Sequence, residues 1–144
     1  MGPRKKLGIQ KTYSSAINSL TTGRRGNAKA QVTLLHGVTG SGKTELYVQL
    51  IQDQLDQGKQ VLFLLPEIAL TTQLIQRLAA YFGEKIGVYH SKFNQNERVE
   101  IWNKVLQDDA HEFRIILGAR SSVFLPFQNL GLIIVDEEHE GSSN

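Results

Sequence analysis

The chain of 144 residues contains no cysteine, one tryptophan, one methionine and three prolines. Without cysteine it can form neither a disulfide bond nor a thiolate metal site, and this fits a reducing compartment, so the cytoplasm is the expected location. Its four histidines are scattered along the sequence, and we therefore expect no zinc site. No apolar run approaches the length of a membrane span, and no apolar signal-peptide core follows the N-terminus.

The charges are distributed unevenly, although the formal net charge is only +2. Residues 1–30 hold seven lysines and arginines and no acidic residue, whereas residues 31–144 hold nine of these basic residues and fourteen acidic ones. We expect a basic lead-in over 1–30, with a short helix at 11–20, and one domain over 31–144. The lead-in could meet nucleic acid phosphates, but for residues 1–6 a solvated arm is the favoured interpretation.

One glycine-rich stretch, residues 37–44, fits the pattern G-x-x-x-x-G-K-[ST] of a phosphate-binding loop. Glycines let the backbone approach a ligand so closely that its N–H groups can form an anion cradle. A strand is expected before the loop and a helix after it, as the motif requires. Lys43 would then contact the β- and γ-phosphates, and the Thr44 hydroxyl would bind Mg²⁺. The predicted nucleotide-binding residues are Gly37, Gly40, Ser41, Gly42, Lys43 and Thr44.

Apolar strands alternate with amphipathic helices along the rest of the chain. The expected strands cover 31–35, 61–65, 86–89, 113–117 and 132–135, and the expected helices cover 44–57, 70–82 and 94–107. Gly58 and Gly83 are stop signals for the first two helices. In the third helix we expect four side chains to face the core, namely Val99, Trp102, Val105 and Leu106. This alternation predicts an α/β fold with a mostly parallel sheet and helices on both faces.

The carboxyl ends of these strands should form one working edge, because ligands of parallel sheets bind there. Asp136 directly follows an apolar strand and could hold the Mg²⁺ that Thr44 also contacts. Glu137 is placed to orient or deprotonate the water that attacks the γ-phosphate. The candidate catalytic residues are therefore Lys43, Asp136 and Glu137, and the candidate metal ligands are Thr44 and Asp136. The other loops expected at this edge are Pro66-Glu67, His90-Ser91 and Gly118-Ala119-Arg120.

The acidic stretch Asp136-Glu137-Glu138-His139 resembles the DExH box of superfamily 2 helicases, and the phosphate loop resembles motif I of that superfamily. Within the superfamily, the chain resembles the primosomal replication-restart helicases over about residues 31–140; the segments that carry this likeness are 35–45, 66–71, 90–91, 97–98, 120–121 and 124–131, with Trp102. The resemblance implies the first RecA-like lobe of a P-loop NTPase, with ATP and Mg²⁺ as cofactors. It also implies that the parent protein is a DNA-dependent ATPase and 3′–5′ DNA helicase in primosome assembly and replication-fork restart.

The resemblance also implies partners and DNA contacts. The partners are single-stranded or forked DNA, the remaining helicase lobe and DNA-binding domains of the parent, and primosomal and single-strand-binding proteins; no membrane is involved. Residues 66–71 and 118–121 correspond to motifs Ia and Ib, so the candidate DNA contacts are Thr71, Arg120 and Ser121. Two positions depart from the family pattern: Ala119 stands where a threonine is usual, and Gln10 is too poorly spaced to serve as the adenine-reading glutamine.

Other functions stay open at this point. The chain could be a stand-alone P-loop nucleotide switch or kinase that never contacts DNA, or a fragment that only binds nucleotide. By the resemblance, a second RecA-like lobe supplies an arginine to the γ-phosphate, so we expect residues 1–144 alone to bind nucleotide weakly, hydrolyse it near background and unwind nothing. The family's motif III strand is also absent, so the strands at 31–35 and 132–135 should either show bare edges or pair directly.

Overall fold

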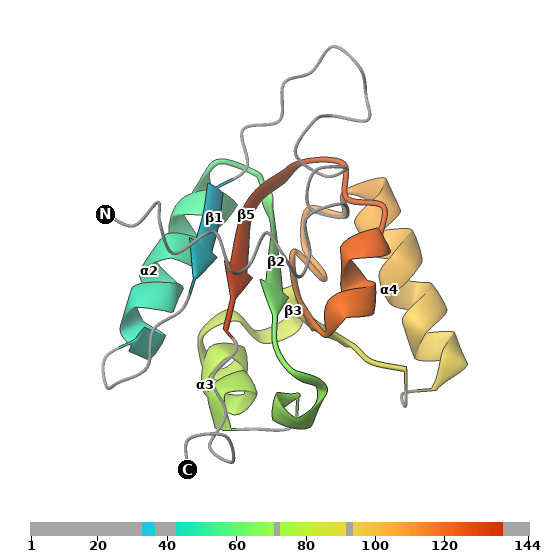
Figure 1. Ribbon diagram of the computed structural model, residues 1–144. Helices are drawn as coiled ribbons and strands as arrows, with labels where there is room; N and C mark the ends of the chain where they lie inside the picture. The colour runs from blue at the N-terminus through green and yellow to red at the C-terminus, as the bar shows by residue number, and fades with distance from the viewer. Residues whose placement is uncertain (1–32, 37–42, 71–72, 92–93, 137–144) are drawn as a thin grey trace.

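A computed structural model describes residues 33–36, 43–70, 73–91 and 94–136 of the chain (Figure 1). Its strands are β1 (Thr33–His36), β2 (Gln60–Leu64), β3 (Ile86–Tyr89), β4 (Ile115–Gly118) and β5 (Leu130–Val135). Its α-helices are α2 (Lys43–Asp56), α3 (Gln73–Phe82) and α4 (Gln95–Gln107), and its short 3-10 helices are η2 (Glu67–Ala69), η3 (Gly83–Lys85) and η4 (Arg120–Phe124). The predicted lead-in over 1–30 lies outside the described residues and stays a prediction.

The five strands form one sheet in the order β1-β5-β2-β4-β3, and every neighbouring pair is parallel. This confirms the predicted α/β fold with a parallel sheet. Strand β1 pairs directly with β5, with Thr33 opposite Leu132 and His36 opposite Val135. Of the two arrangements expected for these strands, direct pairing is therefore the one that the structure has.

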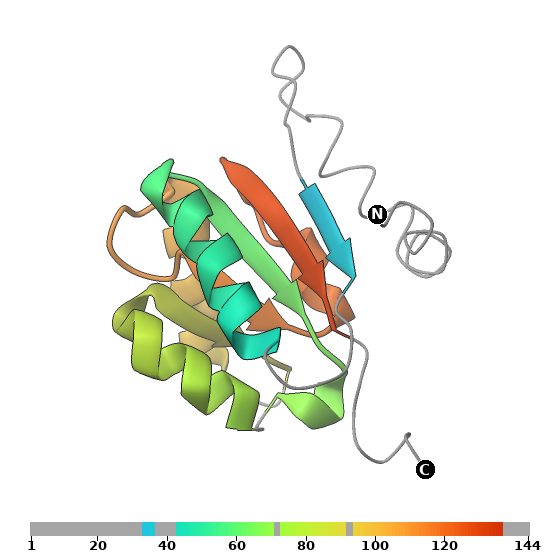
Figure 2. The same cartoon turned by 90° about the vertical axis from the view of Figure 1, so that its left-hand side faces the viewer.

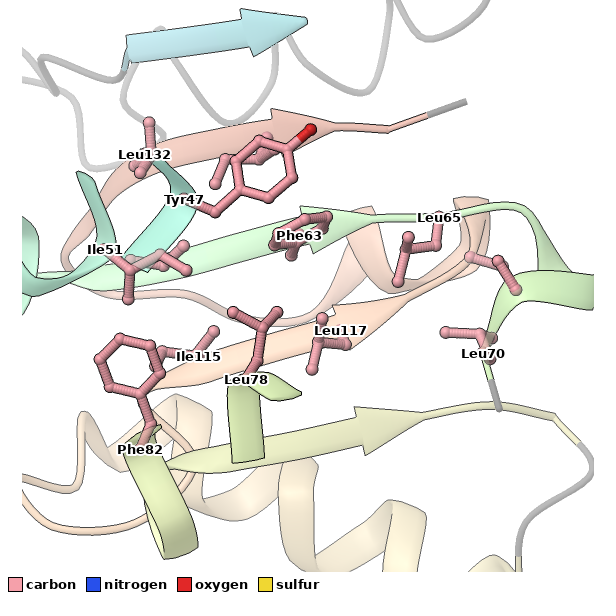
Figure 3. Close-up of a cluster of buried hydrophobic side chains, with 14 residues drawn as sticks. Tyr47, Ile51, Phe63, Leu65, Leu70, Leu78, Phe82, Ile115, Leu117 and Leu132 are labelled. Carbon is pink, nitrogen blue, oxygen red and sulfur yellow. The ribbon is translucent and has the colours of Figure 1, made fainter. Parts of the chain in front are cut away.

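Successive side chains of a strand point to opposite faces of the sheet. Each face therefore has its own set of apolar side chains, and its own helices cover them. Figure 2 views the sheet from the side of α2 and α3, and Figure 3 shows the core beneath them. The buried side chains of this first core include Tyr47, Ile51, Val61, Phe63, Leu78, Ile115, Leu117, Leu132 and Ile134. The second core lies under α4 and η4 and includes Leu62, Leu64, Ile101, Val105, Ile116, Val123, Ile133 and Val135. The unbroken apolar strands are explained by this burial on both faces.

The bounds of the elements follow the sequence prediction closely, and no bound differs from it by more than three residues. The largest difference is at α3, which begins at Gln73 because the residues after Pro66 first form η2. Helix α2 ends as predicted just before Gly58, whose φ of +76° is a left-handed conformation that glycine adopts without strain. None of the helices in the described ranges is long and apolar enough to cross a membrane.

The buried face of α4 differs from the prediction. Of the four side chains expected to face the core only Val105 is buried, whereas Val99, Trp102 and Leu106 are 51%, 40% and 46% exposed. Ile101 is buried in their place. The two stripes are one residue apart, about 100° around the helix, and both carry apolar side chains. Periodicity alone therefore did not choose between them, and the packing of α4 onto the sheet did.

Candidate functional site

The carboxyl ends of the strands meet at one edge of the sheet, since all the strands run in the same direction (Figure 1). Pro66 follows β2, His90 follows β3, Gly118 ends β4 and Asp136 follows β5. Four of the five loops predicted to form the working edge therefore do lie there. The fifth is the phosphate loop, and its residues 37–42 lie outside the described part of the chain.

Asp136 is held in a fixed position at this edge. Its side chain is 2% exposed, and its backbone N–H donates to the Leu64 carbonyl oxygen at 2.9 Å, which ties the end of β5 to β2. The Tyr47 hydroxyl of α2 donates to Asp136 Oδ2 at 3.2 Å. A buried carboxylate is stable only with hydrogen-bond donors or cations around it. The Tyr47 hydroxyl is one such donor.

Helix α2 begins at Lys43, the lysine of the phosphate-loop motif. The first backbone N–H groups of a helix have no partner within it, and they carry the positive end of the helix dipole, so the start of α2 favours an anion. Thr44 lies in this first turn and is half-buried. Several predicted site residues lie outside the described part of the chain. These are Gly37, Gly40, Ser41 and Gly42 of the phosphate loop, the side chain of Lys43, and Glu137 after Asp136.

The predicted DNA contacts Arg120 and Ser121 are exposed on η4, directly after β4. Gly118 lets η4 turn tightly at this point, because a Cβ atom there would lie 2.6 Å from Ser122 Oγ and 3.0 Å from the Tyr89 carbonyl oxygen. The Ser122 side chain is fully buried, and its hydroxyl donates to the Ala119 carbonyl oxygen at 2.6 Å. The helix that carries Arg120 is therefore anchored from within. Thr71 lies outside the described residues.

Sequence reasoning missed two residues of this edge. Tyr47 is not among the candidate residues of the sequence analysis, yet its hydroxyl reaches Asp136. Phe124 had no assigned role, and it is 69% exposed between the buried residues Val123 and Leu125. The sequence did contain a signal for Tyr47. It places a hydroxyl at a core position, three residues after Thr44, although a purely apolar residue would pack there as well.

A parallel sheet, a glycine-rich phosphate-loop sequence leading into α2 and a buried acid after β5 together define a P-loop nucleotide-binding domain. The family model described as DEAD/DEAH box helicase matches residues 11–144. The chain therefore belongs to the DEAD/DEAH box helicase family, and membership of this family implies a nucleotide-binding domain.

Within this family the chain is similar to replication restart proteins. Replication restart protein PriA of Bacillus subtilis (strain 168) is 49% identical over 112 residues, which are 78% of this chain and 14% of that protein. The protein of the same name from Synechocystis sp. is 53% identical over 109 residues, or 76% of this chain and 13% of that protein. That of Helicobacter pylori (strain J99) is 43% identical over 134 residues, or 93% of this chain and 21% of that protein. The chain thus spans a small part of the length of these relatives.

Proposed function

We propose that this chain is the ATP-binding lobe of a DNA-dependent ATPase and 3′–5′ DNA helicase that acts in primosome assembly and replication-fork restart. The observation that carries the proposal is the buried Asp136, which follows β5 and is hydrogen-bonded to the helix that begins at the phosphate-loop lysine. The likeness to proteins named for replication restart supports the particular pathway. The other partners of the proposal are the remaining helicase lobe and DNA-binding domains, and primosomal and single-strand-binding proteins.

ATP and Mg²⁺ fit the residues of this edge. Thr44 and Asp136 offer a hydroxyl and a carboxylate oxygen, and Mg²⁺ prefers such oxygen ligands. When bound, Mg²⁺ would neutralise charge on the β- and γ-phosphate oxygens during hydrolysis. The N–H groups of residues 37–44 and the Lys43 ammonium would hold the phosphates, and Glu137 would orient the attacking water.

We further propose that a DNA strand crosses this edge over η4. Arg120 and Ser121 are exposed there, and a guanidinium and a hydroxyl are both suited to phosphate oxygens. In a 3-10 helix, side chains three residues apart lie on the same face. Phe124 therefore shares the face of Ser121, and its exposed ring is suited to stacking on a base. By its place in motif Ia, Thr71 belongs to the same interface.

The rival function is a stand-alone nucleotide switch or kinase that does not bind DNA. The adjacent pair Asp136-Glu137 and the exposed Arg120 on η4 favour the helicase. A switch or kinase does not bind nucleic acid, so it does not need an arginine on a neighbouring loop for that purpose. The ATPase rate of the intact protein with and without forked DNA separates the two. The proposal expects DNA to raise the rate, and the rival expects no effect of DNA.

The phosphate-loop assignment has its own test. Lys43→Ala should weaken the binding of ATP clearly more than the binding of adenosine, because the lost ammonium group contacts only phosphates. Isothermal titration of both ligands measures this difference. Equal losses for the two ligands would contradict the assignment.

A further inference from the structure

Tyr47 connects the phosphate-loop helix to the acid at the end of β5. Its side chain is 1% exposed, and its hydroxyl donates to Asp136 Oδ2, although 89 positions separate the two residues in the sequence. Asp136 itself is 2% exposed. The contact therefore joins two buried groups from the two halves of the proposed nucleotide site.

The ring of Tyr47 has little freedom to move. It packs edge-on against Phe63, with ring centroids 4.9 Å apart and an angle of 85° between the ring planes. Figure 3 shows the ring within the core between α2 and the sheet, with its hydroxyl oxygen directed toward β5, the strand that carries Leu132. Because a tyrosine side chain has only two rotatable torsions before its hydroxyl oxygen, a fixed ring also fixes the position of that oxygen.

Packing alone does not explain the hydroxyl. The neighbours of Tyr47 in this core are apolar, and a phenylalanine would fill the same space. A buried hydroxyl without a partner is destabilising, and Asp136 accepts a hydrogen bond from this one. The contact also spans from α2 to β5, and so it sets where the acid lies relative to the helix that carries Thr44.

We propose that Tyr47 is a positioning residue for the metal ion of the nucleotide site. Its hydroxyl holds Asp136 Oδ2 from the core side and so orients the carboxylate toward a cation shared with Thr44. Partners that orient metal ligands in this way change metal affinity without contacting the metal. The inference rests on the proposed function, because it assumes that Asp136 and Thr44 serve a nucleotide-bound divalent cation.

The test is Tyr47→Phe in the intact protein, with Mn²⁺ as a spectroscopic substitute for Mg²⁺. Tyr47→Phe keeps the ring against Phe63 and removes only the hydroxyl. Titration of Mn²⁺ followed by electron paramagnetic resonance in the presence of ADP should show about a 10-fold weaker Mn²⁺ affinity. The affinity for ADP in EDTA should equal that of the unchanged protein, since the phosphate loop is intact.

The matched control is Tyr89→Phe, which removes a hydroxyl from β3, a strand separated from β5 by β2 and β4. It should leave the Mn²⁺ affinity unchanged. An Asp136→Asn background gives a second readout: there, Tyr47→Phe should have no further effect on Mn²⁺ affinity, because the carboxylate that the hydroxyl orients toward the metal is already gone.

Two outcomes would overturn the inference. One is a Mn²⁺ affinity of Tyr47→Phe equal to that of the unchanged protein. The other is an equal loss of ADP affinity in EDTA and in Mn²⁺, which would mean that Tyr47 supports the helix rather than the metal site. A failure of the proposed function is distinguishable from both, because the unchanged protein itself would then show no effect of Mn²⁺ on ADP binding.

Discussion

Polar side chains at the amino edge of the sheet, where the strands begin, and at the carboxyl edge, where they end, differ in how deeply they are buried. At the amino edge, Arg114 is 5% exposed and donates to the Asp108 carboxylate, to the Asp109 carbonyl oxygen at 2.7 Å and to the Gly58 carbonyl oxygen at 2.7 Å. These bonds tie the loop before β2 to the loop before β4. At the carboxyl edge, by contrast, Arg120 and Ser121 are exposed on η4.

Gln60 repeats the pattern of the amino edge. It is 1% exposed, its Oε1 accepts the backbone N–H groups of Gln128 and Asn129, and its Nε2 donates to the Val105 carbonyl oxygen at 3.1 Å. A buried amide is stable only when its donors and acceptors are used in this way. The amino edge therefore uses its polar side chains to join loops of the fold.

The carboxyl edge carries exposed side chains of two kinds. Besides its exposed polar groups it presents two exposed apolar side chains, Ile68 at 66% and Phe124 at 69%, on its short helices η2 and η4. The difference between the edges shows that polar residues in the loops of a parallel sheet have no single role. Gln60 and Arg114 at the amino edge are buried and join loops of the fold, whereas Arg120 and Ser121 at the carboxyl edge are exposed beside the buried Ser122. Variants at the two edges should therefore separate stability from activity.

The largest effect is expected at the amino edge. Arg114→Ala removes a buried cation with three acceptors, and we expect it to lower the free energy of unfolding by about 3 kcal/mol. Native-state hydrogen exchange of the β2 and β4 amides measures this loss. The control is Arg77→Ala on α3, an exposed arginine whose loss should change stability by less than about 0.5 kcal/mol. Similar values for the two variants would contradict the role assigned to this edge.

Glu137→Gln should act on turnover and leave the fold alone. We expect ATP binding to stay nearly intact while turnover falls at least ~10²-fold, because the attacking water loses its base. Steady-state ATPase kinetics and nucleotide titration measure the two quantities. Glu138→Gln is the matched control and should retain turnover. If Glu137→Gln stayed active, the catalytic role would belong to Glu138 or to another residue.

Arg120→Ala should have a smaller effect, confined to DNA. We expect a lower affinity for single-stranded DNA and a salt slope reduced by about one unit, with no change in base preference, because a phosphate contact is lost. Fluorescence anisotropy across a range of salt concentrations measures the slope. Lys85→Ala, at the opposite edge in η3, should leave the slope unchanged. An unchanged slope in Arg120→Ala would make Arg120 a structural residue.

The smallest effect is a pH dependence at the amino edge. Backbone N–H groups of His111 and Glu112, each 2.8 Å from Asp109 Oδ1, lower the pKa of Asp109 below 3.8, and Lys104 adds to this. A lowered pKa stabilises the fold above pH 3.8, and the contribution is lost as the pH falls through the folded-state pKa. Asp109→Asn should therefore make the melting temperature fall less steeply below about pH 4. Asp53→Asn on α2 is the exposed control, and an identical pH profile for the two variants would contradict the prediction.

Much of the fold was predictable because local signals agreed with one another. The apolar run after Gly58 becomes β2, Pro66 ends it, and the acid after the last apolar run becomes the buried Asp136. These features depend on residues that are close in the sequence. The errors arose elsewhere: in α4 two neighbouring stripes are both apolar, and Trp102 was assigned to the wrong one.

By itself, the sequence determined the types of the elements, their order along the chain and the edge at which the candidate residues lie. Periodicity, glycine and proline positions and the phosphate-loop motif are local, and parallel strands bring their carboxyl ends together whatever their order. Only the tertiary structure decided the strand order β1-β5-β2-β4-β3, the buried face of α4 and the contact between Tyr47 and Asp136. Each of these depends on which surfaces pack most closely between segments far apart in the sequence, and close packing is a property of the whole core rather than of any one segment.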